Sequence, residues 1–223
     1  MSSAAPPEGY TSRSPTAEDA EAVAELMGAC QVADGDKREM TAEELLGDWE
    51  RIDLGEEAVV VVSADGRIAT SADVYNRSYV RVSVYGYVHP DHWGRGLGSY
   101  LVAWADVWTR ERMDRAPSGS QVIVDHYMRS SNGTARSLMQ AHGYGQVRTI
   151  YVMAVRLEGP PPPSEWPEGI AVRAFLPGKD EQAIFEAGED AFRDSWGRPP
   201  GTYEGWIGPT KATGFDPTPL VPG

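Results

Sequence analysis

The sequence predicts an α/β fold, because stretches with strand periodicity and stretches with helical periodicity alternate along most of its 223 residues. The clearest strand is YVRVSVYGYV, residues 79–88, whose two faces differ: Val80, Val82, Val84 and Val88 on one, and Tyr79, Arg81, Ser83, Tyr85 and Tyr87 on the other. The clearest helix follows soon after it, with apolar side chains at helical spacing: Leu97, Leu101, Trp104, Ala105 and Trp108.

Two helices are expected before this strand. The pattern TAED at 16–19 is a capping box, and it follows a short strand expected around Tyr10–Arg13. The helix it opens has a buried stripe of Ala20, Val23, Ala24 and Met27. The pattern TAEE at 41–44 opens a second, shorter helix that carries Leu45, Leu46 and Trp49.

The remaining elements of the first domain are strands and one more helix. AVVVVS (58–63) and RIATSADVY (67–75) flank Asp65-Gly66, which predicts a hairpin, and Gly86 predicts a bulge or a close approach in the next strand. Further along, SQVIV (120–124) is predicted as a strand, TARSLMQAHGY (134–144) as a helix and TIYVMAVRL (149–157) as a closing strand.

A proline-rich stretch divides the chain. GPPPPSEWP lies in a linker at 158–167, which separates a domain at 9–157 from a region at 168–223. That region echoes the start of the chain at an offset of about 160 positions: EGIAVR at 168–173 matches EGYTSR at 8–13, apolar helical patterns follow both, and GW at 205–206 parallels DW at 48–49. The echo predicts a partial second repeat, whose Trp196, Trp206 and Phe215 would pack against the first domain or in a homodimer.

Composition excludes several classes of function. The net charge of −13 argues against nucleic acid and against anionic membrane surfaces as partners. The N-terminal residues lack the pattern of a signal peptide and no stretch has the length of a membrane span, so a cytoplasmic location is expected. The single cysteine, Cys30, allows no internal disulfide, and the pair His89 and His92 lacks a third ligand, so no metal site is expected.

The most informative motif is VHPDHWGRGLGSYL, residues 88–101. Gly94, Gly96 and Gly98 stand at alternate positions just before a helix, where free backbone N–H groups suit a phosphate, and Arg95 adds positive charge. A dinucleotide fingerprint needs a third glycine where Ser99 stands, and a Walker loop needs a lysine, which is absent between Lys37 and Lys179.

The order of elements and two motifs resemble the GNAT superfamily of acyl-CoA-dependent N-acyltransferases. The first motif is YVHPDHWGRGLG (87–98), which resembles the family's strand corner and Q/R-x-x-G-x-G/A loop, and the second is NGTARSLMQAHGY (132–144). The resemblance covers about residues 9–157 and implies a mixed, largely antiparallel sheet flanked by helices. The echo further along the chain resembles tandem members of the superfamily.

The resemblance also implies a site for acetyl-CoA. Backbone groups of Tyr87 and Val88 would bind the pantetheine arm, and Asn132 would hydrogen-bond it. The pyrophosphate would lie in the loop made by Trp93, Gly94, Arg95, Gly96, Leu97, Gly98 and Ser99.

Three positions depart from the family pattern. Trp93 replaces the usual Gln or Arg at the head of the loop, and Met139 stands where many members have the tyrosine that protonates the departing thiolate. Tyr127 or Tyr144 could replace that acid. The strand at 79–88 contains no carboxylate to act as base, which leaves His126 and Asp125 as the nearest candidates. Tyr127 and His126 are the catalytic residues we predict.

The predicted function is transfer of an acetyl group from acetyl-CoA to a primary amine of a small molecule, by direct attack because no cysteine neighbours the loop in sequence. The alternative is an acyl-CoA-binding module that senses without turnover. The acceptor is expected beside the helices at 17–30 and 41–51, whose connecting loop carries Asp34, Asp36 and Glu39, a set compatible with a cationic amine.

Overall fold

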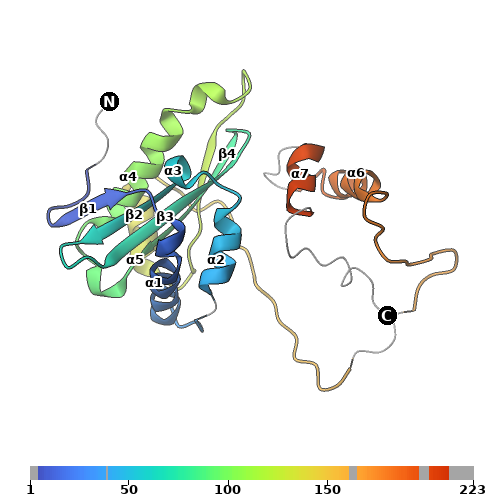
Figure 1. Ribbon diagram of the computed structural model, residues 1–223, viewed down its shortest axis with the longest axis horizontal. Helices are drawn as coiled ribbons and strands as arrows, with labels where there is room; N and C mark the ends of the chain where they lie inside the picture. Colours follow the sequence, from blue (N-terminus) through green and yellow to red (C-terminus); the bar gives the residue numbers. More distant parts are fainter. Residues whose placement is uncertain (1–4, 39, 161–164, 196–200, 211–223) are drawn as a thin grey trace. The chain divides into compact units, whose positions relative to one another are not determined.

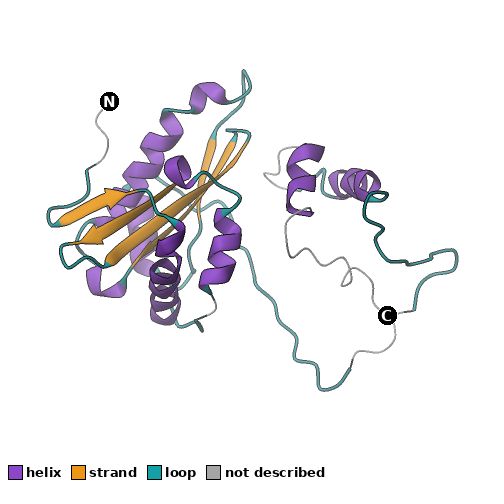
Figure 2. Cartoon of the chain, viewed as in Figure 1, coloured by secondary structure: helices purple, strands orange, loops and turns teal. Residues whose placement is uncertain are grey.

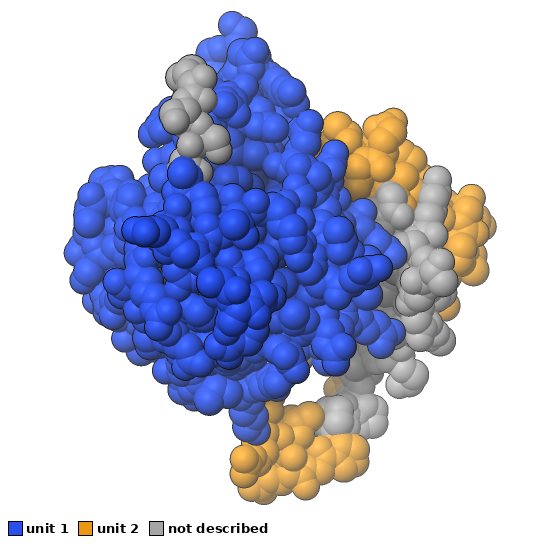
Figure 3. Space-filling model, turned by 60° about the vertical axis from the view of Figure 1, so that its left-hand side comes forward, with its two compact units in different colours: residues 1–149 blue, residues 150–223 orange. Residues whose placement is uncertain are grey.

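The computed structural model describes residues 5–38, 40–160, 165–195 and 201–210. The chain divides into two compact units, residues 1–149 and residues 150–223, which are coloured separately in Figure 3.

The first unit is built on a five-stranded sheet whose strands follow one another in chain order (Figure 2). Neighbouring strands are antiparallel from the first to the fourth, and the fifth runs parallel to the fourth. This mixed, mostly antiparallel sheet with flanking helices confirms the predicted α/β class. The strands are β1 (Tyr10–Arg13), β2 (Ala58–Ser63), β3 (Ile68–Arg77), β4 (Arg81–Val88) and β5 (Ile123–His126).

Helices cover both faces of this sheet (Figure 1). On one face, α1 (Ala20–Ala33) and α2 (Ala42–Trp49) pack against Val60. On the other face, α4 (Leu97–Arg110) packs against the even-numbered side chains of β4, and α5 (Gly133–Ala141) contacts α4. The short α3 (Leu54–Glu57) leads into β2, and 3-10 turns occur at Ala17–Asp19, Pro90–His92 and Met113–Arg115.

The alternation along β4 explains these two faces. Val82 and Val84 are almost fully buried with Ala105 and Trp108 of α4, as the period-two pattern predicts. The odd-numbered residues of β4 therefore face α1 and α2. Both predicted capping boxes are present: Asp19 closes the box of Thr16, and Glu44 closes the box of Thr41.

Three predicted strands differ from the structure at their ends: the third runs from Ile68 to Arg77 instead of from 67 to 75. The fourth strand begins at Arg81 instead of Tyr79, because Ser78 and Tyr79 adopt left-handed backbone angles, with φ of 53° and 56°, in the turn from β3. The fifth begins at Ile123 instead of Ser120, after a turn in which the Ser120 N–H donates to the Pro117 carbonyl.

The predicted strand at 149–157 is wrong. Residues 149–157 have no regular secondary structure, and their large apolar side chains are mostly exposed, with Val152 at 87% and Met153 at 89%. The segment has strand-forming side chains, but a strand also needs a neighbour for its backbone groups, and no strand in the described part of the chain pairs with it.

The described residues of the second unit form two helices, α6 (Glu181–Ala191) and α7 (Tyr203–Thr210). Their aromatic side chains meet, with the ring centre of Phe185 5.7 Å from that of Tyr203 and 6.0 Å from that of Trp206. The echo at 168–173 forms no strand. Trp196 and Phe215, expected to pack this region, lie outside the described residues, as does part of the linker at 161–164. The partial repeat stays a prediction.

Candidate active site

The glycine loop is a helix N-terminus with free donors. Gly94 and Gly96 have φ of 74° and 82°, angles that side chains rarely adopt, and Gly96 caps α4. The first helical hydrogen bond runs from the Tyr100 N–H to the Gly96 carbonyl. The N–H groups of Leu97, Gly98 and Ser99 therefore have no acceptor within the helix and can bind an anion.

Gly98 serves close packing at this helix start. A Cβ atom built on Gly98 would lie 2.8 Å from Cδ2 of Leu138 in α5, which is closer than real contacts allow. The absence of a side chain thus lets α5 approach the first turn of α4. This contact brings the motif at residues 132–144 beside the motif at residues 87–98.

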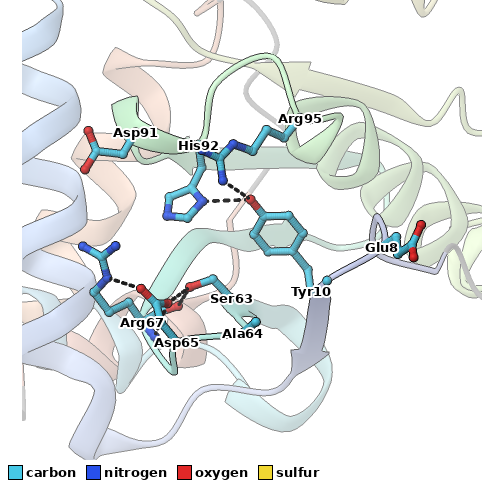
Figure 4. Close-up of a pocket in the computed structure, with 10 residues that line it drawn as sticks. Glu8, Tyr10, Ser63, Ala64, Asp65, Arg67, Asp91, His92 and Arg95 are labelled. Carbon is cyan, nitrogen blue, oxygen red and sulfur yellow. Dashed lines mark hydrogen bonds and ion pairs between the residues drawn. The ribbon is translucent and has the colours of Figure 1, made fainter.

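Arg95 extends from the loop into a pocket of about 560 Å³ (Figure 4). Its Nη1 donates to the hydroxyl of Tyr10 over 3.3 Å, and the same hydroxyl lies 2.8 Å from Nδ1 of His92. Burial lowers the pKa of His92, and the nearby charge of Arg95 lowers it further, so His92 is neutral at pH 7. The hairpin residues Asp65 and Arg67 form the opposite wall.

Next to the loop, β4 has an open edge. The pairing of β5 with β4 ends at Val84 and His126, so Gly86 and Val88 lie beyond it. The Ile123 N–H donates to the Val80 carbonyl, and the His89 N–H donates to Ala69 of β3, so even-numbered residues of β4 direct their backbone groups toward β5 and odd-numbered ones toward β3. Gly86 and Val88 thus face the open side.

The two residues predicted to bind pantetheine therefore differ in their backbone environment. The Tyr87 backbone faces β3, and its carbonyl also accepts from Oγ1 of Thr70. The Val88 carbonyl faces the open side but accepts from Nε1 of Trp93 at 2.8 Å and from Sγ of Cys30 at 3.2 Å. Trp93 thus contributes a side-chain donor at this edge. The geometry points to Gly86 as the neighbour of Val88 in this role.

Asn132, expected to bind pantetheine, and two of the carboxylates expected at the acceptor side, Asp34 and Asp36, already have partners. Asn132 caps α5 by accepting from the Ala135 N–H, and its Nδ2 donates to Asp34 over 2.9 Å. Asp36 forms an ion pair with Arg129. These two contacts tie the α1–α2 loop to the β5–α5 loop. Because both carboxylates already have partners, they are poor candidates for an amine ligand, and Glu39 lies outside the described residues.

The structure places His126 and Tyr127 on opposite sides of the sheet. His126 packs on the α4 side, where its ring lies 4.8 Å from that of Tyr144, and burial lowers its pKa. Tyr127 stacks on Tyr85 with ring centres 5.3 Å apart, on the side of α1 and α2. The two predicted catalytic residues are therefore not brought together.

The other two candidates have partners of their own. The Tyr144 hydroxyl donates to Asp106 over 2.6 Å, and its burial together with this bond to a carboxylate raises its pKa. Asp125 forms a nearly buried ion pair with Arg81, with 2.6 Å between Oδ2 and Nε. Neither is poised to exchange a proton with an acceptor. In the described part of the chain, no three His, Cys, Asp or Glu side chains gather as a metal site would require.

One carboxyl group that the sequence reasoning missed is Asp73 of β3. Its Oδ1 is buried and has no hydrogen-bond partner among the described residues. Burial raises the pKa of Asp73 to about 7, with Asp48 raising it further and a hydrogen bond from the Trp49 side chain opposing both. Because the fourth strand has no carboxylate, the sequence pointed to Asp125 and His126 as the nearest candidates. Pairing that strand with the third across their turn would have placed Asp73 directly opposite Tyr85.

Comparison with known proteins identifies the family. The family model described as the acetyltransferase (GNAT) family matches residues 21–144. The chain belongs to the GNAT family of acetyltransferases. No described helix is both long and apolar enough to cross a membrane.

Individual relatives agree with this assignment. The mycothiol acetyltransferase of Amycolatopsis mediterranei is 28% identical over 177 residues, which are 77% of this chain and 53% of that protein. A second mycothiol acetyltransferase, from Thermobispora bispora, is 32% identical over 107 residues, covering 48% of this chain and 32% of that protein. The chain thus spans about half the length of the first relative and a third of the second.

Solved structures show the same fold. The GCN5-related N-acetyltransferase from Sphaerobacter thermophilus is 52% identical, with a TM-score of 0.83 over 95% of this chain and 66% of that one. The acetyltransferase yncA from Salmonella typhimurium, solved with its cofactor acetyl-CoA, is 22% identical with a TM-score of 0.51 over 62% of this chain and 80% of that one, and shows the fold alone.

Proposed function

We propose that this chain transfers the acetyl group of acetyl-CoA directly to a primary amine of a small molecule. The observation that carries the proposal is the adjacency of two binding features: the free N–H groups at the start of α4 and the open edge of β4 at Gly86 and Val88. A phosphate fits the first and an extended amide-bearing arm fits the second. Together they suit a long thioester such as acetyl-CoA.

Different residues of the chain bind the different parts of acetyl-CoA. The Leu97, Gly98 and Ser99 N–H groups hold the pyrophosphate, and Arg95 supplies positive charge at the neighbouring pocket. Gly86 and Val88 pair with the pantetheine amides along the open edge. Asn132 joins them through the second N–H of its Nδ2 amide, while the first keeps its bond to Asp34.

Direct attack fits the state of the one cysteine. Cys30 is distant from the loop in sequence but donates its S–H to the Val88 carbonyl, so the fold brings it near the open edge. Burial raises the pKa of the Cys30 thiol to about 11. The thiol is therefore protonated at neutral pH and is not the nucleophile that an acyl-enzyme would need.

We assign the acid that protonates the departing thiolate to Tyr127. Its hydroxyl belongs to a half-exposed side chain on the same side of the sheet as Tyr85, and Met139 cannot donate a proton. His126 lies on the α4 side, where its ring contacts Tyr144, so it does not share a site with Tyr127.

A second candidate function is acyl-CoA binding without turnover. Met139 in the usual position of the acid and the absence of a carboxylate in β4 favour it. Both functions need the glycine loop, so only turnover separates them.

The decisive experiment combines acetyl-CoA binding by calorimetry with a thiol-release assay over glucosamine, spermidine, lysine and tyramine. The loop variant is Gly96→Glu, which places a negative charge at the phosphate site and is expected to weaken acetyl-CoA binding by about 100-fold or more, because like charges at an interface cost several kcal/mol. The matched control is Gly119→Glu, since Gly119 has a similar φ of 80° in a turn away from the loop.

Each outcome has a meaning. Amine-dependent thiol release that is lost in Gly96→Glu and kept in Gly119→Glu supports the transferase. Binding without release supports the non-catalytic module. Equal binding by both variants would contradict the role of the glycine loop.

A further inference from the structure

We propose that Asp73 is the general base of this site and that it receives the proton of a cationic amine acceptor docked against the rings of Tyr75, Tyr85 and Tyr127. We call these four residues together with Asp48 the tyrosine–aspartate cluster. The inference rests on the proposed function, because it names the acceptor class and the base of that same reaction.

The sheet register gathers the cluster. Asp73 lies directly opposite Tyr85 in the antiparallel pair of β3 and β4, so both side chains project from the face that α1 and α2 cover. The Tyr85 ring meets that of Tyr75 edge-on at 5.5 Å and stacks on that of Tyr127 at 5.3 Å. Three aromatic rings and a carboxylate form the kind of site that binds an alkylammonium ion.

The Asp73 carboxylate has an unused acceptor position. Trp49 hydrogen-bonds the group, but Oδ1 is buried and meets no donor among the described residues. A buried polar atom without a partner costs free energy, so its retention calls for an explanation such as a ligand. A primary ammonium carries three N–H donors and would satisfy Oδ1 while its charge faces the rings.

Asp73 is also close to the place where the chemistry is proposed. Tyr85 immediately precedes Gly86, the first residue of the open edge, and Asp73 lies one strand away, about 4.8 Å in a sheet. An amine that touches both Asp73 and Tyr85 therefore lies beside the expected path of the thioester. The carboxylates of the α1–α2 loop, Asp34 and Asp36, are by contrast already bonded to Asn132 and Arg129.

The surroundings of Asp73 poise it for proton transfer near neutral pH. Its pKa is raised to about 7 chiefly by burial, so both protonation states are populated. The groups that face this region are Asp48 and Arg51 from the end of α2, Cys30 from α1, and three tyrosines of the sheet: Tyr75, Tyr85 and Tyr87. Burial raises the pKa of Tyr87 to about 12 and also raises that of Tyr75, so these hydroxyls remain protonated.

The proton balance of the step is simple. The Asp73 carboxylate takes one proton from the ammonium ion, which leaves a neutral amine. The amine nitrogen forms a bond to the thioester carbonyl carbon, the carbon–sulfur bond breaks, and the second amine proton passes by way of Tyr127 to the departing thiolate. Asp73 then returns its proton to solvent, and the products are the acetamide and CoA.

The test compares Asp73→Asn with Asp114→Asn, which makes the same chemical change at an exposed carboxyl group in the turn after α4. Asp73→Asn is expected to lower kcat/KM for the best amine of the panel by about 100-fold, since a general base contributes at least that much. Acetyl-CoA affinity should stay as in the wild type. The acidic limb of the kcat/KM profile, centred near pH 7 in the wild type, should disappear in Asp73→Asn.

Two further variants should move that limb in opposite directions. Asp48→Asn removes a negative charge that raises the pKa of Asp73, so the limb should shift to lower pH. Trp49→Phe removes the hydrogen bond that favours the carboxylate, so the limb should shift to higher pH. A merely structural carboxylate would show neither shift.

The melting temperature of Asp73→Asn shows whether this variant has lost only the base or has also lost its fold. Asp73 has its pKa raised on folding, so the wild type loses stability as pH rises from about 4 to about 7. Asp73→Asn should therefore melt at a higher temperature than the wild type at pH 8, with the difference shrinking toward pH 4. A variant that is more stable and yet inactive has lost chemistry and kept its fold.

The outcomes distinguish the two proposals. No acetyl-CoA binding or no thiol release in the wild type contradicts the proposed function. Release that Asp73→Asn leaves unchanged contradicts the role of Asp73 alone. Where release is absent, the docking site is tested by the binding of benzylammonium chloride to the CoA-saturated protein. Weaker binding to Asp73→Asn than to Asp114→Asn supports the docking site. Equal binding to the two variants, or no binding to the wild type, overturns it.

Discussion

Two helix starts, one in each unit, have the same side-chain arrangement. Arg13 forms a bidentate ion pair with Asp19 just before α1, with both N–O distances at 2.7 Å, and we call this arrangement a fork. Arg173 does the same with Asp180 just before α6, at 2.5 and 2.7 Å. In both, a backbone N–H between the partners donates to the same carboxylate at 2.8 Å, from Thr16 in the first and Leu176 in the second.

The surroundings of the two starts differ. The residues before the first fork form β1, paired with β2, and α1 buries six residues in the core. The residues before the second fork form no strand, with Ile170 57% exposed, and α6 buries none of its residues. The fork and the helix appear wherever the local sequence encodes them, whereas the strand appears only where a second strand is present to pair with it.

The shared fork supports the predicted repeat on grounds that sequence spacing alone did not offer. Arg13 and Arg173 are separated by 160 positions, Thr16 and Leu176 by the same 160, and Asp19 and Asp180 by 161, as the residue numbers show. Bidentate bonding of an arginine to an aspartate at a helix start is specific in geometry. The repeat nevertheless stays a prediction, because only part of residues 168–223 is described.

The largest expected effect is the loss of free energy of unfolding when a buried side chain of α1 is truncated. Leu26→Ala in α1, where Leu26 is 2% exposed, is expected to lower the free energy of unfolding by about 2–5 kcal/mol through lost burial and a cavity. Ile184→Ala in α6, where Ile184 is 41% exposed, should change it by less than about 0.5 kcal/mol. Urea unfolding followed by circular dichroism measures both. A comparable loss in the two variants would show that α6 is packed in solution as tightly as α1.

The same distinction explains which features could be read from the sequence. The capping boxes at Thr16 and Thr41 and the two faces of β4 depend on neighbours within a few residues, and their prediction was confirmed. The segment 149–157 has the side chains of a strand but no partner, so a local pattern predicted it wrongly.

The candidate site likewise has one part that depends on local sequence and another that depends on tertiary contacts. The phosphate loop is a local backbone motif, and it was found from Gly94, Gly96 and Gly98. The position of Asp73 opposite Tyr85 depends on the register between two strands, and the engagement of Asp34 by Asn132 joins residues 98 positions apart. Such relations require the tertiary structure. The acceptor side was therefore predicted on carboxylates that the fold uses elsewhere.

A smaller effect is expected from removing the carboxylate of each fork. Asp19→Ala should lower the free energy of unfolding by about 1–2 kcal/mol, because it removes the carboxylate that caps the helix start and accepts from Arg13 and the Thr16 N–H. Asp180→Ala should leave this main transition unchanged and speed hydrogen exchange at the first amides of α6. Exchange measured by mass spectrometry resolves the two regions. Faster exchange throughout α1 in Asp180→Ala would show that the second fork stabilises more than its own helix.

The smallest effect is a pH dependence that isolates the charge of the first fork. The Arg13 guanidinium, followed by the Thr16 N–H, lowers the pKa of Asp19 to about 2. Because the folded pKa lies below the unfolded value near 3.8, the fork stabilises the protein fully above pH 4, and this contribution is lost as pH falls toward 2. Arg13 is about half exposed, at 47%, so solvent screening reduces the effect to about 1 kcal/mol. Urea unfolding of the wild type and Arg13→Gln at pH 6 and pH 2.5 measures it, and the two proteins should differ less at pH 2.5 than at pH 6. A difference that is as large at pH 2.5 as at pH 6 would mean that Arg13 contributes through packing and not through the charge of Asp19.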